Sequence, residues 1–112
     1  MKGILAGAII ASLLAAGPSP AAETWISCTP VGIVTYRARV HVRCAAAVGG
    51  ISYFAASTQD VAFSARVLSV ITAAQVAGRT LSILYDPADV SGTAIGCLAA
   101  DCRLILAIGF GQ

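Results

Sequence analysis

Strict alternation of apolar and polar positions marks residues 37–44. Successive side chains of a β-strand point to opposite faces, so this pattern predicts a strand with one buried and one wetter face. The buried face would hold small and apolar side chains, from Ala38 to Cys44. The other face would carry a cationic row, which consists of Arg37, Arg39, His41 and Arg43.

Other short apolar segments, separated by turn residues, predict four further strands. The pair Gly49 and Gly50 predicts the turn after the second strand. Residues 86–102, rich in Gly, Ala and Asp, are expected to form a loop. The four predicted strands cover residues 24–36 (interrupted near Thr29, Pro30 and Gly32), 51–56, 80–85 and 103–110.

Residues 61–77 predict one helix of about 18 residues, because they contain no Gly or Pro. Residues 57–60 offer N-caps, and Gly78 stands where a C-cap glycine belongs. The only charged side chain in this helix is Arg66, and Gln75 is the only amide. A helix with one face in water should carry a polar stripe, and this helix has none. We therefore expect its second face to be covered by another subunit. The alternative is an alanine-rich outer face that tolerates water.

The predicted order is strand, strand, strand, helix, strand, strand. A mainly β, α+β fold with one helix follows, and this order is that of the OB-fold, a five-stranded partly open barrel. The main competitor is an α+β sandwich with one helix on an antiparallel sheet. Two strands joined through the helix could also be parallel neighbours.

Residues 1–21 have the pattern of a secretory signal peptide, with Lys2 followed by an apolar run over residues 4–16. Ser19 and Ala21 suit the −3 and −1 positions of a cleavage site, which predicts cleavage after Ala21. The run is shorter than the roughly 20 residues of a membrane span, which disfavours an anchor. Residues 22–112 are therefore expected to form one secreted or periplasmic domain without a membrane span.

Four cysteines lie in this small exported domain, so we expect disulfides. Cys28 and Cys44 are symmetric about Tyr36, where a hairpin turn would set them opposite each other. Cys97 and Cys102 would close a short loop before the last strand. The pairings 28–97 with 44–102 and 28–102 with 44–97 stay open. A metal site is disfavoured, because the spacing is not that of a zinc ribbon.

Six arginines against five acids leave residues 22–112 with a net charge of +1 (6 − 5), because the only lysine is Lys2. This balance disfavours general nucleic-acid binding, which needs a strong positive field. The cationic row could still bind a carboxylate, sulfate or phosphate. Alternatively, it is a solvated face whose arginines pair with Asp86, Asp89 or Asp101.

Catalytic groups are sparse, and no cofactor is indicated. His41 is the only histidine, and the neighbouring arginines would lower its pKa. The sequence contains no GxSxG nucleophile elbow, and the cysteines are expected to be oxidised. We therefore expect no enzyme and no catalytic residue.

The chain resembles the B subunits of AB-type bacterial toxins in several features. These are the predicted signal peptide, the size, the strand–helix–strand order, the four cysteines and the final Cys97-x4-Cys102 loop. The similarity is to the subtilase-cytotoxin and pertussis-like group. It implies a disulfide-bonded OB-fold that assembles into a five-membered ring, binds cell-surface glycans and associates with an A-type subunit. The segment before Cys28 is shorter than in that family, and here a strand follows the final loop, so no glycan-contacting residue is transferred.

These features predict an exported, non-enzymatic binding subunit that recognises a glycan or another anionic cell-surface group as a homo-oligomer. Candidate ligand-binding residues are the cationic row and Trp25, an aromatic residue near the mature start. Tyr36, Tyr53 and Tyr85 could also stack on sugars, although Tyr53 and Tyr85 suit the core equally. Two other classes stay open. One is a periplasmic structural or inhibitor protein that binds a protein partner, and the other is a small hydrolase that uses His41 and a carboxylate.

Overall fold

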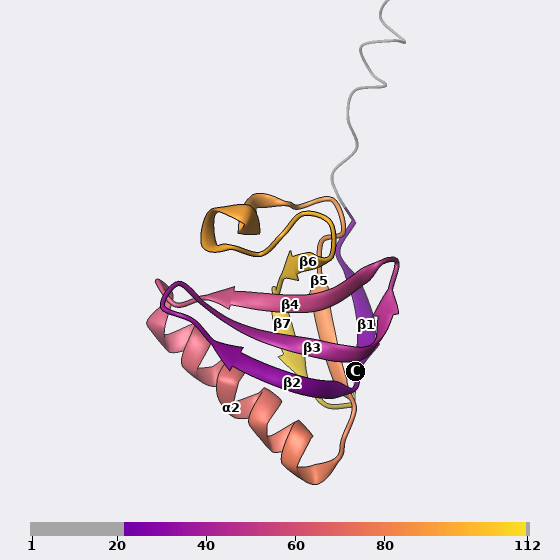
Figure 1. Ribbon diagram of the computed structural model, residues 1–112. Coiled ribbons are helices and arrows are strands. Elements are labelled where there is room, and N and C mark those ends of the chain that lie inside the picture. Colours follow the sequence, from indigo (N-terminus) through magenta and orange to yellow (C-terminus); the bar gives the residue numbers. More distant parts are fainter. Residues whose placement is uncertain (1–21, 112) are drawn as a thin grey trace, which may run out of the picture.

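A computed structural model describes residues 22–111, so the predicted signal peptide lies outside the described residues (Figure 1). The described chain is mainly β, with one long helix and one short 3-10 helix. In chain order the elements are β1 (Thr24–Cys28), β2 (Pro30–Thr35), β3 (Arg39–Val48), β4 (Ile51–Ser57), α2 (Val61–Ala77), β5 (Leu81–Tyr85), η1 (Ser91–Ile95), β6 (Cys102–Leu104) and β7 (Ala107–Gly109).

The strands form two sheets, one in the order β1-β5-β7 and one in the order β2-β3-β4-β6. All pairs are antiparallel except β4 with β6, which are parallel. The predicted α+β class with one helix is therefore confirmed. Within residues 22–111 the hydrogen-bonded strands make two sheets and not one closed barrel.

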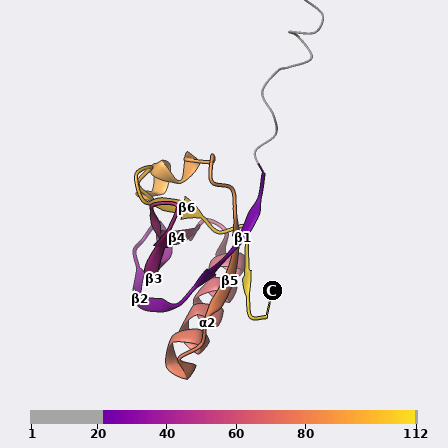
Figure 2. The ribbon, with the colours of Figure 1, turned by 90° about the vertical axis from the view of Figure 1, so that its right-hand side faces the viewer.

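The chain passes between the two sheets twice. Thr29 alone separates β1 from β2, and Figure 2 shows the two strands following one another around a bend. Residues 105–106 separate β6 from β7, so the predicted single final strand is divided into two. A disulfide between Cys28 of β1 and Cys44 of β3 also joins the sheets. Together with the Cys97–Cys102 bond, these are the pairs that the sequence favours.

The core lies between the sheets and α2. Its fully buried side chains include Phe54 on β4, Ile71 on α2 and Ile83 on β5. Burial of apolar surface on this scale is the main term that stabilises a small domain. The ring of Phe54 also meets that of Tyr85 edge-on, with centroids 5.0 Å apart, which places Tyr85 in the core.

Helix α2 begins and ends where the sequence predicts. The Asp60 side chain accepts a hydrogen bond from the Phe63 N–H, and Gly78 adopts the left-handed conformation with φ 66°. Buried positions follow one face of the helix from Ser64 to Ala74. Val61 and Val76 remain 74% and 84% exposed on the opposite side.

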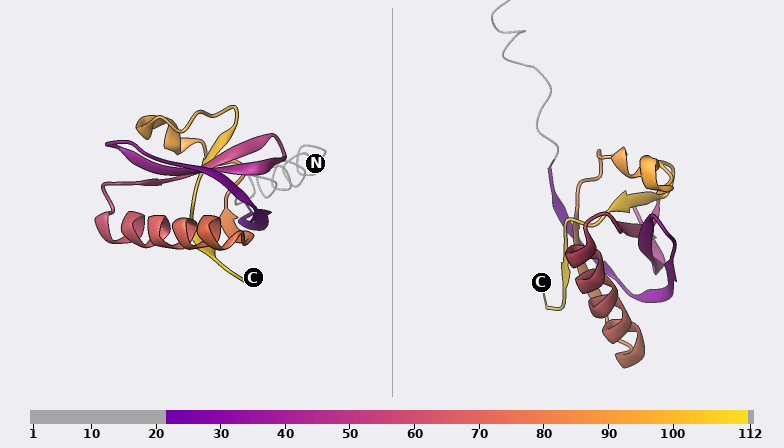
Figure 3. Two further views of the ribbon diagram at one scale, coloured as in Figure 1. Left: turned by 60° about the horizontal axis from the view of Figure 1, so that its bottom comes forward. Right: turned by 90° about the vertical axis from the view of Figure 1, so that its left-hand side faces the viewer.

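The long connection between β5 and β6, residues 86–101, covers part of the larger sheet on the face opposite α2. Figure 3 shows the helix and this connection on either side of the β2–β3–β4 layer. The connection packs on β4 through Ala55, which is fully buried against Cys97 and Cys102. It also contains η1, which the sequence did not predict. No helix among the described residues is long and apolar enough to cross a membrane.

Candidate functional site

A cavity of about 420 Å³ lies between the exposed face of the larger sheet and the 86–101 connection. We call it the sheet pocket. Its volume falls within the roughly 300–1,000 Å³ of small-molecule sites. The lining comes from β2, the β2–β3 turn, β3, β4 and the connection: Gly32, Val34, Tyr36, Arg39, His41, Arg43, Tyr53, Gly96, Leu98, Asp101 and Cys102.

Strand β3 supplies the positive charge of the sheet pocket. Arg39, His41 and Arg43 occupy alternate positions of β3 and all line the cavity, while Val40 and Val42 between them are buried. The alternation predicted from the sequence therefore holds along β3. It fails at Arg37, because the strand begins at Arg39 and Arg37 lies in the turn before it. Arg37 does not line the pocket.

Arg39 is wedged between the sheet and the connection. Its Nη1 donates a hydrogen bond to the Ile95 carbonyl at 2.9 Å, and its guanidinium carbon lies 3.9 Å from the centroid of the Tyr36 ring. Its Nε is buried and has no hydrogen-bond partner. No carboxylate among residues 22–111 forms an ion pair with it. The cation is thus held in place by an aromatic face and a single carbonyl.

Gly96 makes room for that guanidinium. It has φ +88°, which side chains disfavour, and a Cβ added there would lie only 2.4 Å from Arg39 Nη1. Gly96 follows Ile95, which accepts the hydrogen bond. The backbone of the connection therefore lies so close to Arg39 that no side chain fits at position 96.

His41 sits between two aromatic rings. The Tyr36 and Tyr53 ring centroids lie 5.3 Å and 5.2 Å from that of His41, and only 9% of the histidine is exposed. Burial, and then the positive charge of Arg39, lower the pKa of His41. The imidazole is consequently neutral at pH 7, with Arg39 and Arg43 as its charged neighbours on β3.

Tyr53, Leu98 and Asp101 complete the lining of the pocket around the β3 residues. Tyr53 lies directly across from Arg43 in the register of β4 with β3. Leu98 on the connection is 65% exposed at the rim, and Asp101 is the one carboxylate among the lining residues. The site therefore combines cationic, aromatic and apolar groups around one acid. Such a lining suits an anionic group attached to a flat or partly apolar body.

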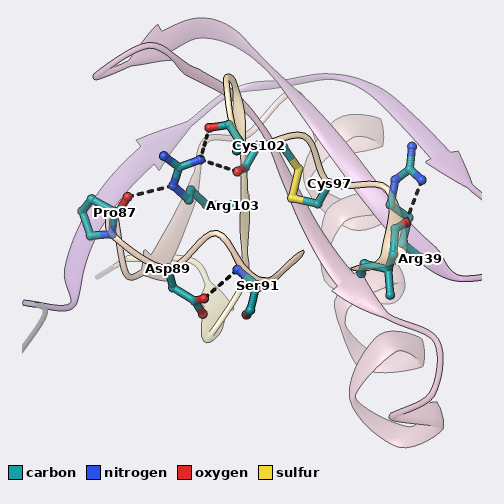
Figure 4. Close-up of a disulfide and its surroundings, with 9 residues drawn as sticks. Arg39, Pro87, Asp89, Ser91, Cys97, Cys102 and Arg103 are labelled. Carbon is teal, nitrogen blue, oxygen red and sulfur yellow. Dashed lines mark hydrogen bonds between the residues drawn. A yellow bond between two sulfur atoms is a disulfide. The ribbon is translucent and has the colours of Figure 1, made fainter. Parts of the chain in front are cut away.

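The connection is held in shape by several contacts (Figure 4). The Cys97–Cys102 disulfide, with a sequence separation of 5, closes a short loop over residues 98–101. Arg103 donates hydrogen bonds to the carbonyls of Pro87, Ala99 and Cys102. Further toward its start, Asp89 accepts a bond from the Ser91 N–H, and contacts with Ser91 lower the pKa of that carboxyl group. This wall of the pocket is therefore built in advance of any ligand.

Trp25 lies elsewhere. It is 45% exposed on β1, in the smaller sheet, and does not line the pocket. The proposed pairing of the cationic row with Asp86, Asp89 or Asp101 is also wrong for the described residues, which contain no such ion pair. No group of three His, Cys, Asp or Glu side chains in residues 22–111 could hold a metal ion.

The sequence missed the contribution of the connection. Gly96, Leu98 and Asp101 line the pocket only because the Cys97–Cys102 loop folds back over β4. The spacing of Cys97 and Cys102 could have indicated this contribution, since a short disulfide loop directly before a strand must pack near the sheet. Tyr36 and Tyr53 were recognised as aromatic candidates, but not as the two flanks of His41.

Comparisons of the chain with protein-family models, curated proteins and solved structures found no match.

Proposed function

We propose that this protein is an exported, non-enzymatic binding subunit and that its sheet pocket binds an anionic group carried by a glycan. The anion would be a carboxylate or a sulfate, held by Arg39 and Arg43. The tyrosines flanking His41 would pack against the sugar, as aromatic rings do at carbohydrate sites.

The observation that carries this proposal is the state of Arg39. A buried N–H donor without a partner costs about 1–3 kcal/mol, and Arg39 Nε is such a donor. Nη1 has one protein acceptor, the Ile95 carbonyl, and because Arg39 lines the pocket, its Nη groups can donate further hydrogen bonds to ligand oxygens, whereas the buried Nε is not directly accessible. Arginine forks match planar anions in geometry as well as in charge.

We propose an OB-like barrel as the finer description of the fold, and this description supports the same site. If β1–β2 and β6–β7 are each counted as one bent strand, the strand pairs make a complete circuit of five. In that numbering the pocket lies on strands 2 and 3, between the loops that follow strands 1 and 4. OB-folds bind oligosaccharides and oligonucleotides at this position.

The proposal is tested on an array of matched neutral, carboxylated and sulfated glycans. Residues 22–112, in the oxidised form, should bind acidic members and leave their neutral counterparts unbound. Arg39→Gln keeps the side chain polar but removes its charge, and it should abolish that preference. Equal binding of neutral and acidic glycans, or an unchanged pattern in Arg39→Gln, would contradict the proposal.

We also propose that the protein acts as a homo-oligomer. The support is the outer side of α2, where Val61 and Val76 are exposed and where Arg66 is the only charged side chain of the helix. Native mass spectrometry of the oxidised domain should give a closed assembly. Val76→Glu would place a charge on this side and should shift the mass toward the monomer. A monomeric wild type would overturn the proposal and favour a protein that works alone or with a different partner.

A further inference from the structure

His41 occupies the middle of the cationic row and is the only titratable group there that changes charge near neutral pH. Arg39 and Arg43 precede and follow it by two residues on the same face of β3, at about 6.5–7 Å spacing. Any anion held by both arginines would therefore lie over the imidazole. The charge of that ring then decides part of the binding energy.

The groups that face His41 come from every wall of the pocket. Strand β3 contributes the two arginines, and the β2–β3 turn and β4 contribute Tyr36 and Tyr53. Strand β2 contributes Gly32 and Val34, which carry no charge. The connection contributes one charged group, Asp101. Two cations against one acid disfavour a third positive charge in the empty pocket.

We propose that binding of an anion in the sheet pocket is coupled to uptake of one proton from solvent by His41, so the site binds anions more tightly in acid. This inference rests on the proposed anion site. The proton adds to the free ring nitrogen and forms an imidazolium, and no bond of the ligand is broken. Release of the anion in neutral solution returns the proton.

The physical basis is linkage between two ligands of one site. Burial and Arg39 hold the pKa of His41 low when the pocket is empty. An anion places negative charge beside the ring and raises that pKa. By reciprocity, protonation must strengthen anion binding by the same factor. Because one proton is involved, the affinity can change by at most about tenfold per pH unit.

The experiment uses sodium sulfate as the probe and sodium chloride at equal ionic strength as the reference, since screening alters all exposed charges. His41 is the only histidine of the chain, so its ring signals in NMR need no assignment. Sulfate should raise the pKa of His41. The sulfate dissociation constant should fall several-fold from pH 8 to pH 5.

Calorimetry in buffers of different ionisation enthalpy supplies an independent readout, because proton uptake makes the observed heat depend on the buffer. The dependence should correspond to a fraction of one proton per sulfate near pH 6. His41→Gln keeps a polar side chain at this place without the titration. In that variant the sulfate affinity should vary less than twofold across the same pH range.

Two failures are distinguishable. If sulfate binds with the same affinity at pH 5 and pH 8 and leaves the titration of His41 unchanged, the coupling is overturned while the anion site stands. If sulfate at tens of millimolar shifts no pocket signal at any pH, the anion site itself is overturned. Arg39→Gln, which removes a positive neighbour, should raise the pKa of His41 without sulfate, and a lowered value would also contradict the coupling.

Discussion

The two faces of the β2–β3–β4 layer are made from alternate residues of the same strands, yet they differ in composition and in what covers them. The inner face, with Val42 and Phe54, is fully buried beneath α2. The outer face, one residue away along each strand, carries His41 and Tyr53 into the sheet pocket. A period of two thus lets one strand contribute to the core and to the pocket through different residues. Substitutions on the two faces should therefore have separable effects.

The largest expected effect comes from a pair of neighbours on β4. Phe54→Ala removes a fully buried ring and should lower the free energy of unfolding by about 3–5 kcal/mol. Tyr53→Ala removes a half-buried ring from the pocket and should cost about 1 kcal/mol while weakening sulfate binding. Urea denaturation measures both, with Phe54→Leu as a milder variant in case the alanine variant does not fold. Equal losses for Phe54→Ala and Tyr53→Ala would erase the distinction between the faces.

Removal of each disulfide should likewise affect stability and sulfate binding to different extents. Removing Cys28–Cys44, whose cysteines are 16 residues apart, should cost about 3 kcal/mol in the chain-entropy model. Removing Cys97–Cys102, whose separation is 5, should cost about 2 kcal/mol. Only the second change loosens the wall of the pocket, so it should weaken sulfate binding more than the first. Double Cys→Ser variants, compared by thermal melting and sulfate titration, check both orders.

A substitution at Gly96 tests whether the close approach of the connection to Arg39 is needed for sulfate binding. Gly96→Ala should cost about 1–2 kcal/mol, because alanine disfavours a left-handed backbone. It should also push the guanidinium of Arg39 away and abolish sulfate binding. Gly50→Ala is the matched control, since its φ of +82° is similar but an added Cβ meets nothing within 4 Å. If the two variants bind sulfate alike, the close approach to Arg39 has no role.

The pH dependence of stability tests His41 without any ligand. Its pKa is lowered in the folded protein relative to about 6.5 in the unfolded chain. The unfolded chain therefore takes up this proton first, and stability is full above pH 6.5 and declines as the pH falls below it. Subtracting the urea curves of His41→Gln isolates the contribution. A wild type that gains stability over the variant on acidification would contradict the sign.

The smallest effect is expected at Trp25. Trp25→Ala should leave the sulfate affinity unchanged, because this residue lies on the other sheet and outside the pocket. Sulfate titration of the variant checks this. A loss comparable to that of Arg39→Gln would move the binding site to the smaller sheet.

The fold was predictable wherever local signals suffice. The caps at Asp60 and Gly78 located α2, and the period-two pattern identified the faces of β3 from Arg39 onward. The start of β3 was missed because Arg37 continues the alternation while the backbone is still turning. The 3-10 helix of residues 91–95 has no periodic signal, since its position depends on the close packing of Gly92 against Cys97 and Leu104.

Only the part of the candidate site that lies on β3 was predictable from the sequence. Arg39, His41 and Arg43 follow from one strand, which the sequence reveals directly. The other half comes from a segment some fifty residues later, whose position depends on tertiary packing of Ala55 against Cys97 and Cys102. Trp25 was chosen as an aromatic residue near the mature start, and neither property tells which sheet a residue lies on.

The most direct test of the central claim is an amide NMR titration of residues 22–112 with sodium sulfate at pH 6, against sodium chloride at equal ionic strength. Shifts should concentrate at residues 36–43, at Tyr53 and at residues 95–102, and Arg39→Gln should lose them. Shifts that spread evenly over the arginines, or that gather around Trp25, would contradict an anion site in the sheet pocket.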